Sequence, residues 1–158
     1  MIKRGIKMKK IMFVCTGNIC RSAMAHRMLE KYINDKNKQN EVEVYSCGIF
    51  AETNDVSTKE AIEVMKEYNV NLTTHRATNI RESNISDMDV ILCATEEHKS
   101  HVIYMYPELN ERIFTMKEYA GFPKNDLNIK DPWGFNKETY RNCAKEIKKC
   151  IDKYMEKI

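Results

Sequence analysis

The chain has 158 residues, of which 42% are hydrophobic and 31% are charged, and its 26 basic and 23 acidic residues leave a formal net charge of +3. This length and balance indicate one globular domain able to bury a core, and they are not those of a disordered tail or a coiled coil. The charges are spread along the chain, so the small positive excess favours anionic ligands weakly and gives no argument for nucleic acid.

The start of the chain is basic but lacks the features of a targeting segment. Its first ten residues read "MIKRGIKMKK", and the apolar run that follows, Ile11–Val14, is too short for a signal peptide or a membrane span. Met8 would also serve as a start. We therefore expect a cytoplasmic protein in which residues 1–8 are a dispensable N-terminal extension and residues 9–158 form one domain.

The first part of the chain predicts a strand, a helix and a second strand. Ile11–Val14 suits one buried strand, and apolar side chains recur at helical spacing from Ser22 to about Asp35. Residues 41–46 then alternate as a strand does. Residues 57–60 read "STKE", the Ser-x-x-Glu form of a capping box, which predicts a helix beginning there with Ser57 as its cap.

The second part continues the alternation. The segment "DVILCA" at 89–94 predicts a buried strand, followed by a helix that opens at Thr95 and ends near Pro107. Residues 112–116 predict a fourth strand, and residues 140–155 a long amphipathic helix. This order predicts a single three-layer α/β domain, a four-stranded parallel sheet with helices on both faces, whose ligands bind beyond the carboxyl ends of the strands.

Cysteine and histidine spacing gives no metal site. The six cysteines are dispersed, as expected for buried thiols in a reducing compartment. A zinc site needs closely spaced ligand pairs in two places, and no such set is complete here. The pair His98 and His101 is expected at solvated positions of a helix.

The segment "VCTGNICRS" at 14–22 joins the first strand to the first helix. Gly17 permits a tight turn in which backbone N–H groups converge, and the helix adds its own free N–H groups and its positive end. Such a turn cradles an oxyanion, and Arg21 can offer it two parallel donors. The cradle favours the thiolate of Cys15, a nucleophile for a bound phosphate that would give a cysteinyl-phosphate intermediate. The alternative is a buried cysteine followed by an ordinary Gly-Asn turn.

This chemistry also needs an acid for the leaving oxygen and then a base for water. In "KDPWGF" at 130–135, Asp131 is the candidate, held by Pro132 on a restricted turn beside Trp133. The alternative is that the Asp-Pro pair only starts the turn before the last helix.

These segments together resemble the low-molecular-weight protein tyrosine phosphatase family, in the bacterial branch that also contains protein arginine phosphatases. "VCTGNICRS" and "DPWG" carry the resemblance, and "YSCG", "THRATNI", "DVILCAT" and "IFTMKEYA" fall in the family's order, so it covers the chain from about Lys9. The resemblance implies a phosphatase domain over residues 9–158, with Cys15 as nucleophile, Arg21 as phosphate clamp, and Asp131 as general acid and then base. The phosphate-binding loop would also contain Thr16, Gly17, Asn18, Ile19, Cys20 and Ser22.

The resemblance also implies roles that the residues alone do not. The side chains of Asn18, Ser22, Ser46 and His75 match a buried hydrogen-bond network that holds the loop open in the family. Cys20 matches a cysteine that can pair with the nucleophile on oxidation. No metal and no organic cofactor is expected. Ala23 and His26 depart from the common proline and glutamate, which affects only details of helix entry.

Substrate choice is predicted from the pocket walls. Trp133 occupies the aromatic position of the acid loop, and Ile49 with Phe50 is expected to line the opposite wall. Ile19 stands where the arginine phosphatases typically have threonine, and its apolar bulk favours a tyrosine ring. We therefore expect a phosphotyrosine protein as substrate, with phosphoarginine as the alternative. No nucleic-acid or membrane partner is expected, and the chain should be a monomer or weak dimer.

Two other classes compete. Thioredoxin-linked arsenate reductases share the loop, but they need two further cysteines on a mobile segment, and here Cys93 lies within a strand with Ser100 seven positions later. Cys143 and Cys150 have the spacing, but they lie in the last predicted helix. A non-catalytic phosphoprotein-binding module would not need both Cys15 and Asp131.

Overall fold

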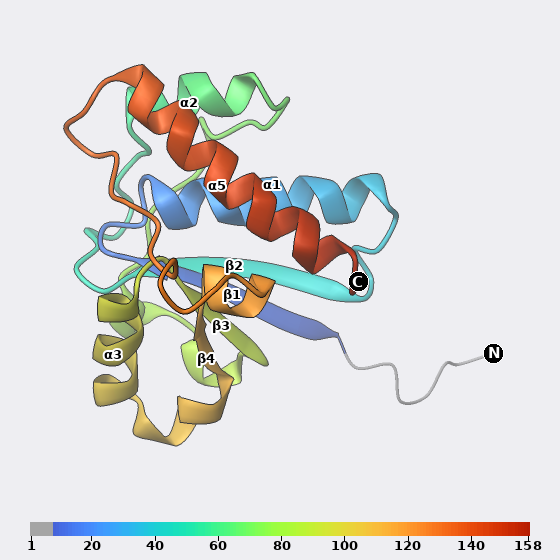
Figure 1. Ribbon diagram of the computed structural model, residues 1–158, viewed down its shortest axis with the longest axis vertical. Helices are drawn as coiled ribbons and strands as arrows, with labels where there is room; N and C mark the ends of the chain where they lie inside the picture. The colour runs from blue at the N-terminus through green and yellow to red at the C-terminus, as the bar shows by residue number, and fades with distance from the viewer. Residues whose placement is uncertain (1–7) are drawn as a thin grey trace.

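The computed structural model describes residues 8–158 as a sheet between layers of helices (Figure 1). The predicted N-terminal extension, residues 1–8, lies outside the described residues except for Met8. The strands are β1 (Lys9–Cys15), β2 (Val42–Gly48), β3 (Val90–Cys93) and β4 (Ile113–Thr115). The helices are α1 (Arg21–Asp35), α2 (Lys59–Lys66), α3 (Glu96–Met105), α4 (Met116–Ala120) and α5 (Lys137–Met155), with 3₁₀ turns at Ile80–Glu82, Ile85–Asp87 and Pro107–Arg112.

The four strands form one parallel sheet in the order β2-β1-β3-β4. Strand β1 is central, with Cys15 opposite Gly48 of β2 and Val14 opposite Cys93 of β3. Because all strands run in one direction, their carboxyl ends meet at one edge, where ligands of such sheets bind. The predicted fold class is confirmed, and the loop after Cys15 lies at that edge.

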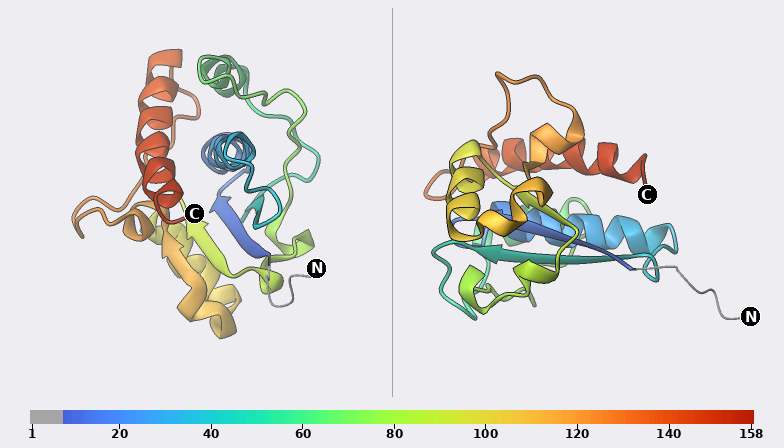
Figure 2. Two further views of the ribbon diagram at one scale, coloured as in Figure 1. Left: turned by 90° about the vertical axis from the view of Figure 1, so that its right-hand side faces the viewer. Right: turned by 90° about the horizontal axis from the view of Figure 1, so that it is seen from below.

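Alternate residues of β1 face two separate cores. Ile11 and Phe13 pack into the larger core, which α1 and α5 cover, whereas Met12 and Val14 pack into a smaller core with Val102 of α3. Figure 2 shows α1, α2 and α5 on one side of the sheet and α3 on the other. All four of these β1 side chains are at most 2% exposed, which explains why the strand reads as a continuous apolar run rather than an alternating one.

Helix ends differ from the predictions in two places. Thr58, not Ser57, caps α2, because its extended backbone lets its hydroxyl accept the N–H of Ala61, while Ser57 is buried before the helix. Helix α5 begins at Lys137, since the Asn136 side chain accepts the N–H of Thr139. Within residues 8–158, no helix combines the length and apolar character needed to cross a bilayer.

Candidate active site

The loop between β1 and α1 takes a shape that two small features permit. Asn18 has a left-handed backbone, with φ of 56°, a conformation that asparagine tolerates better than most residues. Gly48 lies directly against the loop, and a Cβ there would meet the Thr16 carbonyl oxygen at 2.5 Å and the Asn18 nitrogen at 2.9 Å. The end of β2 must therefore be glycine for the loop to pack against it.

Cys15 lies at the base of this loop and contacts Ser22 on the first turn of α1. The two side chains are 2.9 Å apart between Sγ and Oγ, and Asn18 Nδ2 donates to the same Ser22 oxygen at 2.8 Å. The Ser22 hydroxyl accepts from Asn18, and its own hydrogen has two acceptors in reach, the Cys47 carbonyl oxygen at 3.5 Å and the sulfur of Cys15 at 2.9 Å; a Cys15 thiolate would be the stronger of the two. The first N–H groups of α1 have no partners within the helix, so they add positive potential around the thiol.

Arg21 is only 4% exposed and links this loop to the segment that carries Asp131. Its Nη1 donates to the carbonyl of Ile129 at 2.9 Å, and its Nη2 lies 3.6 Å from an Asp131 carboxylate oxygen. Its Nε has no hydrogen-bond partner among the described residues. A buried, partnerless guanidinium N–H beside a thiol is suited to bind an anion.

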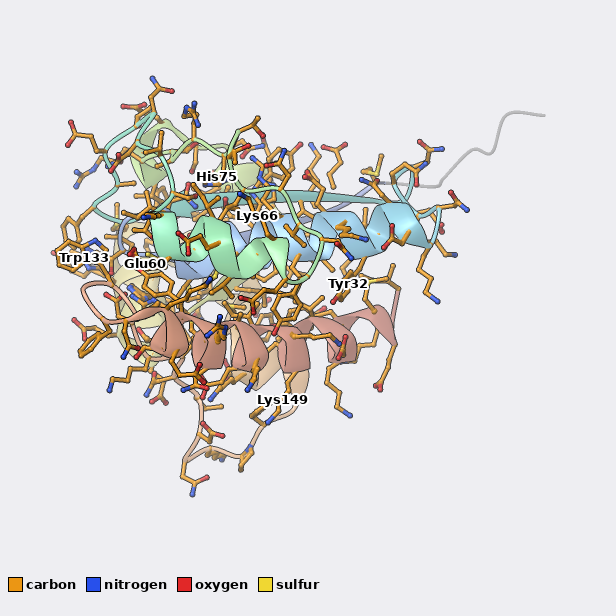
Figure 3. All side chains as sticks on the ribbon, turned by 90° about the horizontal axis from the view of Figure 1, so that it is seen from above. Tyr32, Glu60, Lys66, His75, Trp133 and Lys149 are labelled. Atoms are coloured by element: carbon orange, nitrogen blue, oxygen red, sulfur yellow. The ribbon has the colours of Figure 1, made fainter. Side chains whose placement is uncertain are left out.

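The segment containing Asp131 is held over the loop from both sides. The Ile129 N–H donates to the carbonyl of Ala94, just after β3, and the Trp133 N–H donates to Asp131 Oδ1 at 3.1 Å. The Asp131 side chain is 52% exposed, so it remains in contact with water while facing Arg21. Trp133, labelled at the left-hand end of the molecule in Figure 3, is 62% exposed.

These elements enclose a cavity of about 230 Å³. Its walls are formed by Cys15, Thr16, Gly17, Ile19, Cys20, Arg21, Asp131 and Trp133. Thus the three predicted catalytic residues share one cavity with two of the predicted wall residues, Ile19 and Trp133.

The other two predicted wall residues do not line the cavity. Ile49 is 4% exposed and belongs to the smaller core, because the chain just beyond Gly48 turns its side chain beneath the sheet edge. Phe50 is 71% exposed and its ring stacks edge-on against His101, with 5.5 Å between ring centres. Burial contradicts the expected place of Ile49 in the opposite wall, whereas the role of Phe50, which is exposed and hydrogen-bonded to the loop through its backbone, stays a prediction.

His75 supports the loop from outside, at the position the resemblance indicated. Its Nε2 lies 3.0 Å from the Asn18 carbonyl oxygen, and Arg27 Nε donates to its Nδ1 at 3.1 Å. Because Nδ1 accepts, the ring proton is on Nε2, which donates to the loop. Burial, together with the charge of Arg27, lowers the His75 pKa to about 4, so the ring is neutral near pH 7.

Ser46 does not contact the loop network directly. Its hydroxyl lies 2.6 Å from His26 Nδ1, and the other His26 nitrogen is 3.7 Å from a Glu30 carboxylate oxygen. The His26 ring meets the His75 ring edge-on, with 5.9 Å between centres. His26, which stands where glutamate is common, is therefore part of the polar cluster that connects Ser46 to His75.

Cys20 lies at the junction of the loop and α1, where it contacts α5. Its sulfur is 3.4 Å from the Tyr140 hydroxyl and 3.6 Å from that of Thr58. Burial raises the Cys20 pKa to about 11. The thiol is free, as are all six cysteines.

His98 contacts the site, although the sequence predicted a solvated position for it. The ring is 9% exposed, and its Nε2 lies 2.8 Å from the hydroxyl of Thr16, the residue after the nucleophile candidate. Thr95, at the start of α3, holds the other ring nitrogen at 2.9 Å. A helix that begins immediately after β3 places its first turn at the active edge of the sheet, and this is the signal that could have identified His98.

Across residues 8–158, the structure contains no cluster of three or more histidine, cysteine, aspartate or glutamate side chains that could hold a metal ion.

Known proteins resemble this chain in both sequence and structure. A family model described as low molecular weight phosphotyrosine protein phosphatase matches residues 10–158. The chain is 35% identical to a protein-arginine-phosphatase of Geobacillus stearothermophilus, over 94% of this chain and 95% of the relative. It is 33% identical to the protein-tyrosine-phosphatase PtpB of Staphylococcus haemolyticus, over 91% and 96%. The crystal structure of a low molecular weight protein tyrosine phosphatase from T. tengcongensis superposes with a TM-score of 0.87 at 36% identity, covering 95% of this chain and 99% of that one.

Proposed function

Because the chain belongs to the low molecular weight phosphotyrosine protein phosphatase family, and is thus a cysteine-dependent protein phosphatase, we propose that it hydrolyses phosphotyrosine in proteins through a cysteinyl-phosphate intermediate. One observation carries the proposal: Cys15, Arg21 and Asp131 surround one cavity that Ile19 and Trp133 wall with apolar surface. The cavity has room for an aryl phosphate, with the anion at its base and the ring between the walls.

In the first step, the Cys15 thiolate attacks phosphorus in line with the ester bond. Arg21 holds the phosphoryl oxygens with its partnerless Nε and an Nη group, and the N–H groups of the loop and α1 share the charge. As the S–P bond forms and the ester P–O bond breaks, the Asp131 carboxylic acid gives its proton to the leaving phenolic oxygen. The Ser22 hydroxyl stabilises the thiolate before attack and after its release.

In the second step, the Asp131 carboxylate takes a proton from water. The water oxygen attacks phosphorus, the P–S bond breaks, and inorganic phosphate leaves with the thiolate restored. The 52% exposure of Asp131 suits this step, since the carboxylate must reach both a leaving group and bulk water.

Ile19 supports phosphotyrosine as the preferred substrate. Its side chain packs partly on the larger core and partly lines the cavity, so a ligand meets hydrocarbon at this wall. A phenyl ring gains from such a contact, whereas a guanidinium group would lose hydrogen bonds to water there. Phosphoarginine is the alternative, favoured by relatives named protein-arginine-phosphatases at 35% and 32% identity.

The test is phosphate release from matched phosphotyrosine and phosphoarginine peptides. We expect preference for phosphotyrosine, loss of turnover in Cys15→Ser, and a fall of about 100-fold or more in Asp131→Ala. Ile19→Thr is the specificity variant and should raise relative activity on phosphoarginine. Preference of the wild type for phosphoarginine would overturn the substrate assignment while keeping the nucleophile, and unchanged turnover in Cys15→Ser would overturn the mechanism.

Arsenate reduction finds no support in the positions of the other cysteines. Cys93 is fully buried within β3, and burial raises its pKa far above the usual range. Cys143 and Cys150 face the core from α5. A cytoplasmic location and a monomeric or weakly dimeric state complete the proposal, with phosphorylated proteins as the only partners required.

A further inference from the structure

We propose that His98 is a positioning residue of the active site: it orients the Thr16 hydroxyl so that this group donates its proton to an oxygen of the bound phosphoryl group. This inference rests on the proposed function, because it adds a binding group to the same site. The motif that identifies the loop gives the Thr16 side chain no role, and His98 lies 82 positions further along the chain.

Both nitrogens of the His98 ring are engaged. Nε2 lies 2.8 Å from Thr16 Oγ1, and Nδ1 lies 2.9 Å from Thr95 Oγ1. Thr95 also caps α3, since its hydroxyl oxygen accepts the backbone N–H of His98 at 3.1 Å. The ring is therefore fixed between the start of a helix and the loop, and it cannot rotate without breaking two hydrogen bonds.

The ring is neutral at the pH of an ordinary assay. Burial is the main cause that lowers its pKa to about 4, the positive charge of Arg21 adds to the effect, His101 contributes in the same direction, and Asp131 opposes them. A neutral imidazole carries one N–H and one lone pair, so one neighbouring hydroxyl must donate to the ring and the other must accept from it.

Hydrogen-bond accounting selects between the two arrangements. The Thr95 oxygen already accepts a backbone N–H, and its remaining hydrogen has the lone pair of Nδ1 as its partner. His98 then carries its proton on Nε2 and donates it to Thr16 Oγ1. The hydrogen of the Thr16 hydroxyl is left free, and this residue lines the cavity with Cys15 and Arg21.

The backbone of Thr16 is held as firmly as its side chain. Its carbonyl oxygen accepts the N–H of Phe50 at 2.9 Å and lies against Gly48, where even a methyl group would not fit. With the backbone and the hydroxyl oxygen both anchored, the hydroxyl of this exposed residue keeps its hydrogen for an anion bound in the cavity that Thr16 lines. The site thereby gains a neutral donor for phosphoryl oxygens in addition to Arg21 and the loop N–H groups.

The test measures the dissociation constant of inorganic phosphate by titration calorimetry, together with kcat/KM for p-nitrophenyl phosphate. Thr16→Val removes the donor, and Thr16→Ser keeps it. His98→Asn is too short to reach Thr16, whereas the amide N–H of His98→Gln can replace Nε2. We expect Thr16→Val and His98→Asn to weaken phosphate binding about threefold to tenfold, the range of one hydrogen bond, while the Ser and Gln variants stay close to the wild type.

A double variant separates positioning from mere packing. If His98 acts through Thr16, His98→Asn should have no further effect on phosphate binding in the Thr16→Val background. The matched control is His101→Leu. His101 lies about one helical turn after His98 on α3, and its ring contacts Phe50 rather than the loop, so this variant should leave phosphate binding unchanged.

Additive effects of His98→Asn and Thr16→Val would overturn the inference, as would wild-type affinity in Thr16→Val. Thermal unfolding of each variant identifies any that fail to fold, and the Thr16→Val and Thr16→Ser pair then still tests the donor. A wild type that binds phosphate with the expected coupling but hydrolyses no phosphomonoester would refute the proposed function instead.

Discussion

The substitution His75→Gln tests whether the buried His75 ring beneath the loop is neutral in the folded protein. Glutamine can keep both contacts, since its amide N–H can donate to the Asn18 carbonyl and its oxygen can accept from Arg27. What it removes is a titratable ring. The substitution therefore isolates the contribution of one buried, neutral histidine to the pH dependence of stability.

The magnitude follows from the His75 pKa, which falls from an ordinary value of 6.5 to about 4 in the folded chain. As pH drops below 6.5, the unfolded chain takes up a proton that the folded chain excludes, so stability that is complete at pH 7.5 is lost on the way to pH 4. Between pH 7.5 and pH 5.0 this costs the folded state about 2 kcal/mol.

The assay is urea unfolding at pH 7.5 and pH 5.0, followed by far-ultraviolet circular dichroism because the single tryptophan is 62% exposed and reports poorly on burial. The difference at pH 7.5 measures any loss of contacts, and the change between the two pH values measures titration alone. The wild type should lose about 2 kcal/mol more than His75→Gln over this interval. Equal losses in the two proteins would refute the neutral, buried state assigned to His75.

Three further predictions concern backbone packing, thiol reactivity and helix capping. Gly48→Ala should lower the free energy of unfolding by about 1–3 kcal/mol, and lower kcat/KM with it, because the new methyl group would lie 2.5 Å from the Thr16 carbonyl; unchanged values in urea unfolding and steady-state assays would contradict this. Cys20, whose pKa burial raises to about 11, should stay unmodified by iodoacetamide at pH 7.5 while Cys15 is alkylated, and peptide mapping by mass spectrometry would expose the opposite order. Thr115→Ala should cost about 1 kcal/mol in thermal or urea unfolding, since it removes the cap of α4, and a loss near zero would mean that the cap is dispensable.

Local patterns made the strand, turn and helix around Cys15 predictable. The apolar run is continuous because β1 is buried on both faces, and the turn residues follow it directly. The grouping of Cys15, Arg21 and Asp131 needed the resemblance, because more than 100 residues separate the loop from the Asp131 segment. Once the sheet places the carboxyl ends of β1 and β3 side by side, the Ala94–Ile129 hydrogen bond brings that segment back over the loop.

The predictions that failed depend on contacts between distant elements. His98 reads as a polar residue on an exposed helix, and only the position of α3 beside the loop buries its ring. The sequence predicts Ile49, just after the "YSCG" segment, as a wall residue, yet its side chain packs into the smaller core beyond the end of β2. Periodicity describes which face of an element is buried, but it does not say which other element covers that face.

The supports of the loop also set when, during synthesis, the enzyme can first become active. Cys15 leaves the ribosome early, but the clamp Arg21 is tied to the carbonyl of Ile129, and Cys20 rests on the hydroxyl of Tyr140. A nascent chain that ends before Ile129 carries the nucleophile without the carbonyl that holds Arg21 and without Asp131, and one that ends before α5 still lacks Tyr140. We therefore expect the complete site to form only once these later segments have been made, and removal of α5 to take away a contact of the loop that lies more than 100 residues along the chain.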